Sequence, residues 1–300
     1  MFLVIQQGLG VQWMNGPFTC RYCTIGGLQM RYLFLCLLII IIVGISGCAS
    51  DMNETEDSEI LSNASGNGNA TELQVEGAEV EIVSGNMTYP AYVAAPLTDD
   101  SKPAVVLIHS FSGLEQGYLD LSDRLASEGY VVISPQWQTF ETSPGDAVVE
   151  QLIRDSVEYL GTRSDVDTES IGLTGFCAGG RYTMLFLPQI EELESGVAWY
   201  GFPYSGDTEA QPTRPADVIE QLEEPILMIH GTSDQASNIS DIYTYATGLD
   251  DAGKYFELKV YQGQPHGFML EDGELSRSFE AEDAYWQMVT FFDRTLKDGQ

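Results

Sequence analysis

Residues 170–180 have the sequence SIGLTGFCAGG, and this stretch decides the predicted fold. Its first half, residues 170–174, is a short run typical of a buried strand. The second half surrounds Cys177 with small residues in the pattern small-x-nucleophile-x-small. A turn this sharp brings the positions two residues either side of the nucleophile against neighbouring backbone, which glycine tolerates. We therefore predict a strand, a nucleophile elbow and a helix whose N-terminal dipole favours a Cys177 thiolate, rather than a buried, inert cysteine.

The rest of the folded region alternates between short β-branched runs and longer amphipathic stretches. An antiparallel pair at 79–83 and 89–95 comes first, joined at Ser84-Gly85-Asn86. Strands are then expected at 104–108, 130–134, 170–174, 197–200, 226–229 and 256–261. Helices are expected at 119–128, 146–162, 178–191, 216–222, 239–252 and 280–296. This order predicts an α/β domain over residues 79–300, with a mainly parallel sheet, helices on both faces and a site at the carboxyl ends of the strands.

A general base for Cys177 can be sought among three histidines. His109 and His230 each close a predicted central strand, where a histidine commonly bonds to backbone. His266 alone lies beyond the last predicted strand, in the loop Gln-Pro-His-Gly-Phe. This is the place that the chain order nucleophile, acid, histidine requires, so His266 is the candidate base.

The candidate acid is Asp234, which follows the penultimate predicted strand in the segment His-Gly-Thr-Ser-Asp. It would orient His266 and stabilise its charged form, although Gly-Thr-Ser-Asp is also good turn chemistry. Further aspartates lie farther from the strand end, at Asp241, Asp250 and Asp251. The oxyanion hole would combine the backbone N–H groups of Ala178 and Phe111.

These segments together resemble the dienelactone hydrolase family. Gly-Phe-Cys-Ala-Gly-Gly at 175–180, Trp-Tyr-Gly at 199–201, His-Gly-Thr-Ser-Asp and His-Gly-Phe occur in the order and spacing of that family. The resemblance implies an α/β-hydrolase fold without metal or organic cofactor that hydrolyses lactones or small esters through an acyl-enzyme. It assigns nucleophile, acid and base to Cys177, Asp234 and His266, and the oxyanion donors to Phe111 and Ala178.

One position departs from the family pattern. Ser110 stands where founding members carry a glutamate that helps to release the nucleophilic thiolate, so at this position the resemblance does not support the dienelactone substrate. Glu115 lies five residues on and is a candidate replacement. Arg181, directly after the elbow, is a candidate partner for a substrate carboxylate, with an ion pair or helix-surface role as the alternative.

The N-terminal region has the features of an export signal. Residues 33–45 are almost wholly apolar, follow Arg31 and end in Ile-Ser-Gly-Cys, which resembles a prokaryotic lipobox. We expect residues 1–47 to be a signal-peptide region with its start at Met30, Cys48 to carry a lipid anchor, and residues 48–78 to be a flexible polar tether. An uncleaved anchor helix or ordinary secretory cleavage would also place the domain outside the cytoplasm.

Composition narrows the choice of partners. Residues 1–47 hold two Arg and no Asp or Glu, so the other 11 basic and 45 acidic side chains give a net charge of −34. Such a field repels nucleic acid and anionic lipid, and it fits either an adaptation to high salt or an ordinary acidic secreted protein.

The sequence leaves several functions open. We expect a monomeric enzyme that acts on an ester or lactone. A thioesterase or peptidase with the same machinery, or an inactive surface module that binds a ligand, are the alternatives.

Overall fold

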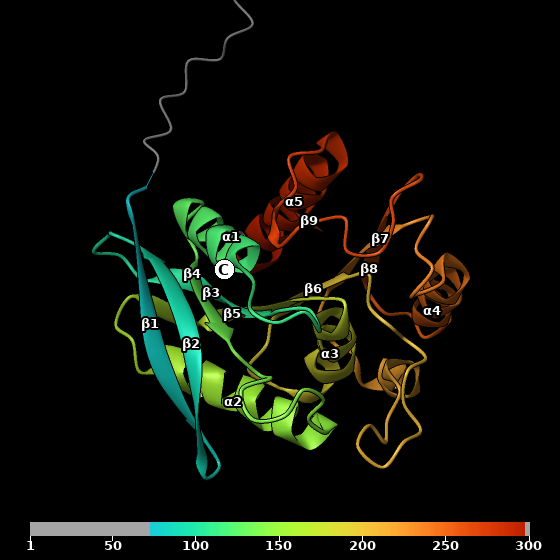
Figure 1. The fold of residues 1–300 in the computed structure, drawn as a ribbon, viewed down its shortest axis with the longest axis horizontal. Helices are drawn as coiled ribbons and strands as arrows, with labels where there is room; N and C mark the ends of the chain where they lie inside the picture. Colours follow the sequence, from blue (N-terminus) through green and yellow to red (C-terminus); the bar gives the residue numbers. More distant parts are fainter. Residues whose placement is uncertain (1–72, 298–300) are drawn as a thin grey trace, which may run out of the picture. The chain divides into compact units, whose positions relative to one another are not determined.

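The computed structural model describes residues 73–297, which form a mixed, mainly parallel sheet with helices on both faces (Figure 1). The eight strands are β1 (Val75–Ser84), β2 (Met87–Pro96), β3 (Lys102–Ile108), β4 (Val131–Pro135), β5 (Val166–Phe176), β6 (Ser195–Trp199), β7 (Ile226–Gly231) and β8 (Phe256–Tyr261). They lie in the order β1-β2-β4-β3-β5-β6-β7-β8. The strands from β4 to β8 pair in parallel, and β2 joins β1 and β4 antiparallel. This is the α/β-hydrolase fold class that the sequence predicts.

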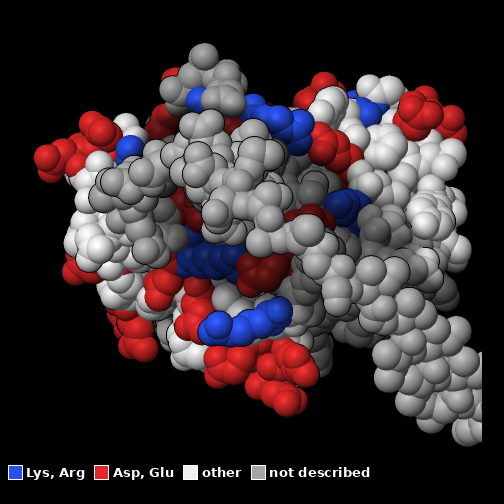
Figure 2. All heavy atoms as spheres, turned by 90° about the horizontal axis from the view of Figure 1, so that it is seen from above, with Lys and Arg blue, Asp and Glu red and all other residues white. Residues whose placement is uncertain are grey.

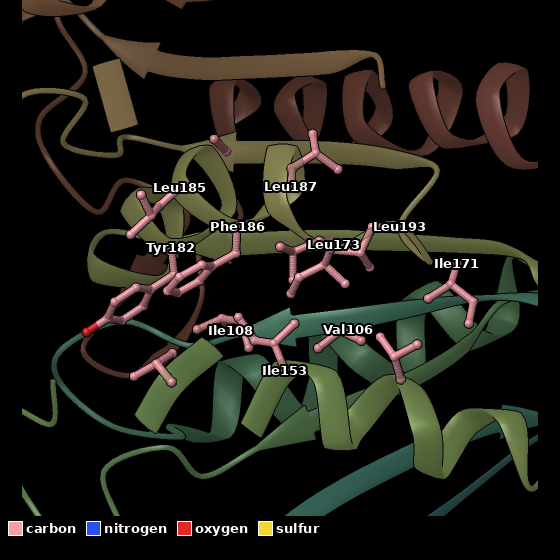
Figure 3. Close-up of a cluster of buried hydrophobic side chains, with 14 of the residues drawn as sticks. Val106, Ile108, Ile153, Ile171, Leu173, Tyr182, Leu185, Phe186, Leu187 and Leu193 are labelled. Carbon is pink, nitrogen blue, oxygen red and sulfur yellow. The ribbon is translucent and has the colours of Figure 1, made fainter. Parts of the chain in front are cut away.

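The helices divide between the two faces because successive strand side chains point in opposite directions. Val106 and Ile108 of β3 pack in the same cluster as α2 (Asp146–Gly161), α3 (Ala178–Phe186) and α4 (Ile239–Asp251). Val105 and Leu107 instead pack with α1 (Gln116–Ser127) and α5 (Phe279–Phe292). Figure 3 shows the first cluster, in which Val106 and Ile108 lie among aliphatic and aromatic side chains of β5, α2 and α3. The central strands are therefore covered on both sides, as a parallel sheet requires.

Several element boundaries differ from those expected. Strand β1 begins at Val75, so the last residues of the expected tether, 75–78, pair with β2. Helix α3 ends at Phe186 and not at residue 191, because Pro188 cannot continue an α-helix; a 3-10 turn, Leu187–Gln189, follows. Two further expected α-helices differ: Pro215–Gln221 is a 3-10 helix, and α5 gives way to a π turn at Asp293–Lys297.

A short hairpin was not predicted. Strands β9 (Leu270–Glu271) and β10 (Glu274–Leu275) pair through a turn at Asp272 and Gly273, both of which have positive φ. Two residues per strand are too few to produce a recognisable alternation of polar and apolar residues.

The N-terminal expectations lie outside the described residues. These are the signal-peptide region 1–47, the start at Met30, the anchor Cys48 and most of the tether. Within residues 73–297, no helix has the length and apolar character needed to cross a membrane. Figure 2 shows one face of the molecule, where clusters of Asp and Glu side chains lie around the rim and Lys and Arg lie beside them.

Candidate active site

The elbow has the strained geometry that its glycines predict. Cys177 joins β5 to α3 with φ 58° and ψ −112°, a conformation that non-glycine residues rarely adopt. A Cβ at Gly175 would overlap the carbonyl of Gly179, and a Cβ at Gly179 would overlap the carbonyl of Ile108. The chain can therefore make this turn only with glycine on both sides, which leaves the Cys177 side chain partly exposed at the carboxyl end of β5.

Asp234 is buried in the turn that follows β7, and its carboxylate is fixed from two directions. Its Oδ1 atom accepts hydrogen bonds from the backbone N–H groups of Ala236, at 2.9 Å, and Ser237, at 2.8 Å. Its Oδ2 atom lies 2.7 Å from Nδ1 of His266. Burial by itself would raise the pKa of Asp234, but the hydrogen bonds from His266 and Ser237 hold it below its usual value. The carboxylate therefore stays ionised and orients the imidazole.

His266 lies between this carboxylate and the thiol of the elbow. Its ring contacts Tyr200, with centroids 5.0 Å apart, and Phe202, with centroids 5.5 Å apart. Its Nε2 atom is buried and has no hydrogen-bond partner of ordinary geometry in the described chain. Burial lowers the pKa of His266, but the interactions with Asp234 and Cys177 outweigh it and raise the pKa to about 9. Asp234 occupies Nδ1, so Nε2 is the nitrogen left to exchange a proton at the elbow.

The other two histidines bond to backbone, as predicted. Nδ1 of His109 donates to the carbonyl of Ser110 at 2.7 Å, and Nε2 of His230 donates to the carbonyl of Ser237 at 2.9 Å. Burial lowers the pKa of His109 to about 4 and also lowers that of His230. Both rings are therefore neutral near pH 7. Nε2 of His230 also lies 3.5 Å from Oδ2 of Asp234, a contact that the sequence did not predict.

The two candidate oxyanion donors come from different strand ends. Ala178 is the first residue of α3, where a backbone N–H has no partner within its helix. Phe111 lies in a turn after β3 in which the N–H of Gly113 bonds to the carbonyl of Ser110 and that of Ser112 bonds to Ser110 Oγ. The N–H of Phe111 makes no hydrogen bond within the described residues. Both N–H groups are thus available for an oxyanion.

A pocket of about 370 Å³ opens above Cys177 and His266. Its lining includes Ser110, Phe111, Ser112, Glu115, Tyr118, Tyr200, Gly267, Leu270, Asp272 and Gly273. Three larger hollows, of about 640, 580 and 420 Å³, contain none of the candidate catalytic residues. The sequence did not indicate that Tyr118, Tyr200 or the β9–β10 hairpin would line the pocket. Tyr118 resembles any other apolar-face residue of an amphipathic helix, so no local signal distinguishes it.

The three substrate-binding candidates differ in their placement. Ser110 and Glu115 line the pocket, as expected of site residues. Arg181 does not: its guanidinium is buried, bonds both carboxylate oxygens of Asp146 at 2.7 and 2.9 Å, and donates to the carbonyls of Ser205 and Thr213. Four of the five N–H donors of the guanidinium are therefore used within the protein. The alternative interpretation, an ion pair, is the correct one for Arg181.

The sheet order, the elbow and the positions of Cys177, Asp234 and His266 define the class of α/β-hydrolases. A family model described as "Dienelactone hydrolase family" matches residues 89–153 and 137–296, and the chain belongs to this family of hydrolases. It is 29% identical over 220 residues to "Putative carboxymethylenebutenolidase" of Escherichia coli (strain K12), a match that covers 68% of this chain and 81% of that protein. It is 27% identical to "Protein usf" of Aquifex pyrophilus, covering 73% and 99% of the two chains.

Solved structures agree with this membership. The crystal structure titled "Putative Dienelactone Hydrolase" from Klebsiella pneumoniae superposes with a TM-score of 0.69 and 26% identity, covering 74% of this chain and 99% of that one. An acylaminoacyl peptidase from Pyrococcus horikoshii superposes with a TM-score of 0.64 and 19% identity, covering 75% and 43% of the chains. The second likeness shows the fold alone.

Proposed function

We propose that this protein hydrolyses a carboxylic ester or lactone through an acyl-enzyme on Cys177. The observation that carries the proposal is the 2.7 Å hydrogen bond between Asp234 and His266, beside a partly exposed cysteine at a strained elbow. A nucleophile, a base and a group that orients the base are the parts that acyl transfer needs.

In the first half-reaction the Cys177 sulfur attacks the carbonyl carbon, and the proton of the thiol is held on Nε2 of His266. The carbonyl oxygen becomes an oxyanion, which the N–H groups of Phe111 and Ala178 stabilise. The C–O bond to the leaving group then breaks, and His266 returns the proton to the departing oxygen. In a lactone the leaving oxygen stays attached to the acyl chain, so the ring opens.

In the second half-reaction water hydrolyses the thioester. His266 removes a proton from the water, the oxyanion forms again at the same two N–H groups, and the C–S bond breaks. Asp234 stabilises the imidazolium in both halves. The relatives named carboxymethylenebutenolidase support a lactone as one substrate type.

The acyl-enzyme provides the direct test. The protein is mixed with p-nitrophenyl acetate and quenched in acid within one turnover, and the Cys177 peptide is analysed by mass spectrometry. We expect an added acetyl group on Cys177, and faster loss of the added mass in wild type than in His266→Gln. An unmodified Cys177 peptide during active turnover would rule out this mechanism.

The N-terminal sequence supports a location for this activity. We propose that Cys48 carries lipid and holds the domain on the outer face of the cell membrane, because residues 33–48 have the composition of a lipoprotein signal. Cells that produce the wild type should retain it with the membrane fraction, and Cys48→Ser should release it or accumulate a longer precursor. Wild type free in the cytoplasm would disprove this proposal.

A further inference from the structure

The pocket carries negative charge at its mouth, which we define as Glu115, Leu270, Asp272 and Gly273. Two of its four residues, Glu115 and Asp272, are carboxylates, and no Lys or Arg is among the described residues that line the pocket. His266 is the lining residue whose side chain has a positive form, and the Asp234 carboxylate, 2.7 Å from its Nδ1 atom, already compensates that charge. A ligand at Cys177 is therefore next to carboxylates without a balancing cation.

Contacts with the backbone hold the mouth in place. The N–H of Gly117 in α1 donates to the carbonyl of Gly273 at 2.8 Å, which docks the β9–β10 hairpin on the first turn of the helix. The Glu115 carboxylate lies over this turn, with Oε1 3.3 Å from the position that a Cβ of Gly273 would take. Glu115 also contributes, after burial, to a raised pKa of Tyr118 on the pocket wall. Since Glu115 and Tyr118 both line the pocket, the charge of Glu115 acts there.

Neither mouth carboxylate has a partner within the described residues. Glu115 precedes α1 in the N-cap position, but its side chain makes no capping hydrogen bond. No ion pair involves Glu115 or Asp272 in residues 73–297, whereas Asp146, Asp217 and Asp283 each hold an Arg or Lys. Both mouth carboxylates are thus free to interact with a ligand.

The basic side chains are engaged elsewhere. Of the eleven Lys and Arg in residues 73–297, ten lie within 4.0 Å of a carboxylate oxygen, and Arg181 is among them. The eleventh, Arg277, is exposed two residues beyond β10 and does not line the pocket. Apart from His266, whose charge Asp234 compensates, the described pocket offers no cation to a substrate carboxylate.

From this arrangement we infer that the pocket selects esters or lactones without a carboxylate, and favours a positively charged substituent at the mouth. The inference rests on the proposed function and adds the substrate class. Like charges brought together at a partly dehydrated site repel, and opposite charges attract, so kcat/KM should rank cationic above neutral above anionic substrates.

An alkylation experiment tests the charge without any turnover. Iodoacetamide is neutral and iodoacetate is an anion, and both modify a thiolate. The rate with iodoacetamide divided by the rate with iodoacetate at Cys177, relative to the same ratio for a small free thiol, therefore reports the local electrostatic field. Mass spectrometry of the Cys177 peptide measures each rate. We expect the ratio to fall about tenfold in Glu115→Gln/Asp272→Asn at low ionic strength.

Two controls separate the mouth from other charges. Glu158→Gln/Asp251→Asn removes the same charge from exposed positions on α2 and α4, and should leave the ratio near the wild-type value. An equal change in this control would overturn the inference, because the field would then come from the whole surface. Selective slowing of iodoacetate in Arg277→Gln would also overturn it, because Arg277 would then attract anions to the pocket.

Esters extend the test to substrates. The p-nitrophenyl esters of pentanoic acid, of a trimethylammonium-substituted butyric acid and of glutaric acid (as monoester) present a neutral, a cationic and an anionic acyl group. We expect at least about a tenfold lower kcat/KM for the glutarate than for the pentanoate, after subtraction of its enzyme-free hydrolysis. Equal rates for these two would overturn the inference while leaving the proposed function intact. Hydrolysis of the pentanoate by Cys177→Ala would instead defeat the proposed function. The alkylation ratio in the wild type would then still test the effect of the mouth carboxylates on charged ligands.

Discussion

The elbow and the mouth line the same pocket but are held in different ways. At the elbow, residues 175–180 touch neighbouring backbone so closely that Gly175 and Gly179 have no room for a side chain. At the mouth, Glu115 and Asp272 are partly or fully exposed on segments more than 150 residues apart in the chain. The difference separates two tasks: the rigid, buried elbow determines where the reaction takes place, and the exposed mouth determines which charge reaches it.

The largest expected effect belongs to the elbow. Cys177→Ala should lower kcat for p-nitrophenyl acetate by at least about 10⁴-fold, because no acyl-enzyme can form. The melting temperature should change little, because alanine fits within the space of the thiol. Initial rates and thermal unfolding on the same preparation measure both quantities. Residual activity close to that of wild type would place the nucleophile elsewhere.

The loss of the Asp234 charge should have the second-largest effect. Asp234→Asn keeps the shape of the side chain but removes the charge that stabilises protonated His266, so kcat should fall by about 10³ to 10⁴-fold. Asp241→Asn, an exposed aspartate on α4, is the matched control and should retain activity. Steady-state kinetics compare the two variants. An equal loss of activity in both would contradict the role of Asp234 as the residue that orients His266.

A pair of glycine substitutions compares the two regions directly. Gly179→Ala forces a Cβ into the backbone carbonyl of Ile108 and should destabilise the fold by about 3 kcal/mol. Gly273 has positive φ, and a Cβ added there would meet only the Glu115 side chain. Gly273→Ala should therefore destabilise the fold by about 1 to 2 kcal/mol. Urea denaturation followed by circular dichroism gives both values. A larger cost at Gly273 would reverse the distinction between elbow and mouth.

The raised pKa of His266, about 9, makes the reactivity of Cys177 in the resting enzyme depend on pH. Below that value the imidazole is protonated and stabilises a Cys177 thiolate, so iodoacetamide should still alkylate Cys177 quickly at about pH 6. His266→Gln should slow the reaction at that pH by about tenfold or more, and the difference should shrink as the pH rises above the pKa of His266. Equal rates in the two proteins at about pH 6 would show that the pair is not charged before substrate binds.

The smallest effect concerns the exposed carboxylates. Their mutual repulsion should weaken as salt shortens the Debye length from about 10 Å to about 3 Å, so the melting temperature should rise by a few degrees. The buried ion pair of Arg181 with Asp146 is shielded from salt, so the destabilisation caused by Asp146→Asn should be nearly independent of ionic strength. Differential scanning calorimetry at low and high salt measures both responses, and a flat wild-type response would favour an ordinary acidic secreted protein.

Residues around the elbow were predictable because their constraints are local. The glycines beside Cys177, the end of the strand before it and the start of the helix after it all lie within eleven consecutive residues. Asp234 and His266 could be chosen because chain order and strand ends restrict the choices. Arg181 could not be assigned in the same way, because its partner Asp146 lies 35 residues away and on another helix.

By itself the sequence determined the α/β class, the succession of strands and helices along the chain and the glycine-dependent turn, because periodicity and backbone sterics act over short distances. Only the tertiary structure decided which side chains share the pocket. Docking of the β9–β10 hairpin on α1 brings Asp272 and Gly273 beside Glu115, and the hydrogen bonds around Asp234 and His266 determine their pKa directions. Charge, burial and proton affinity depend on contacts between distant segments, which no local pattern records.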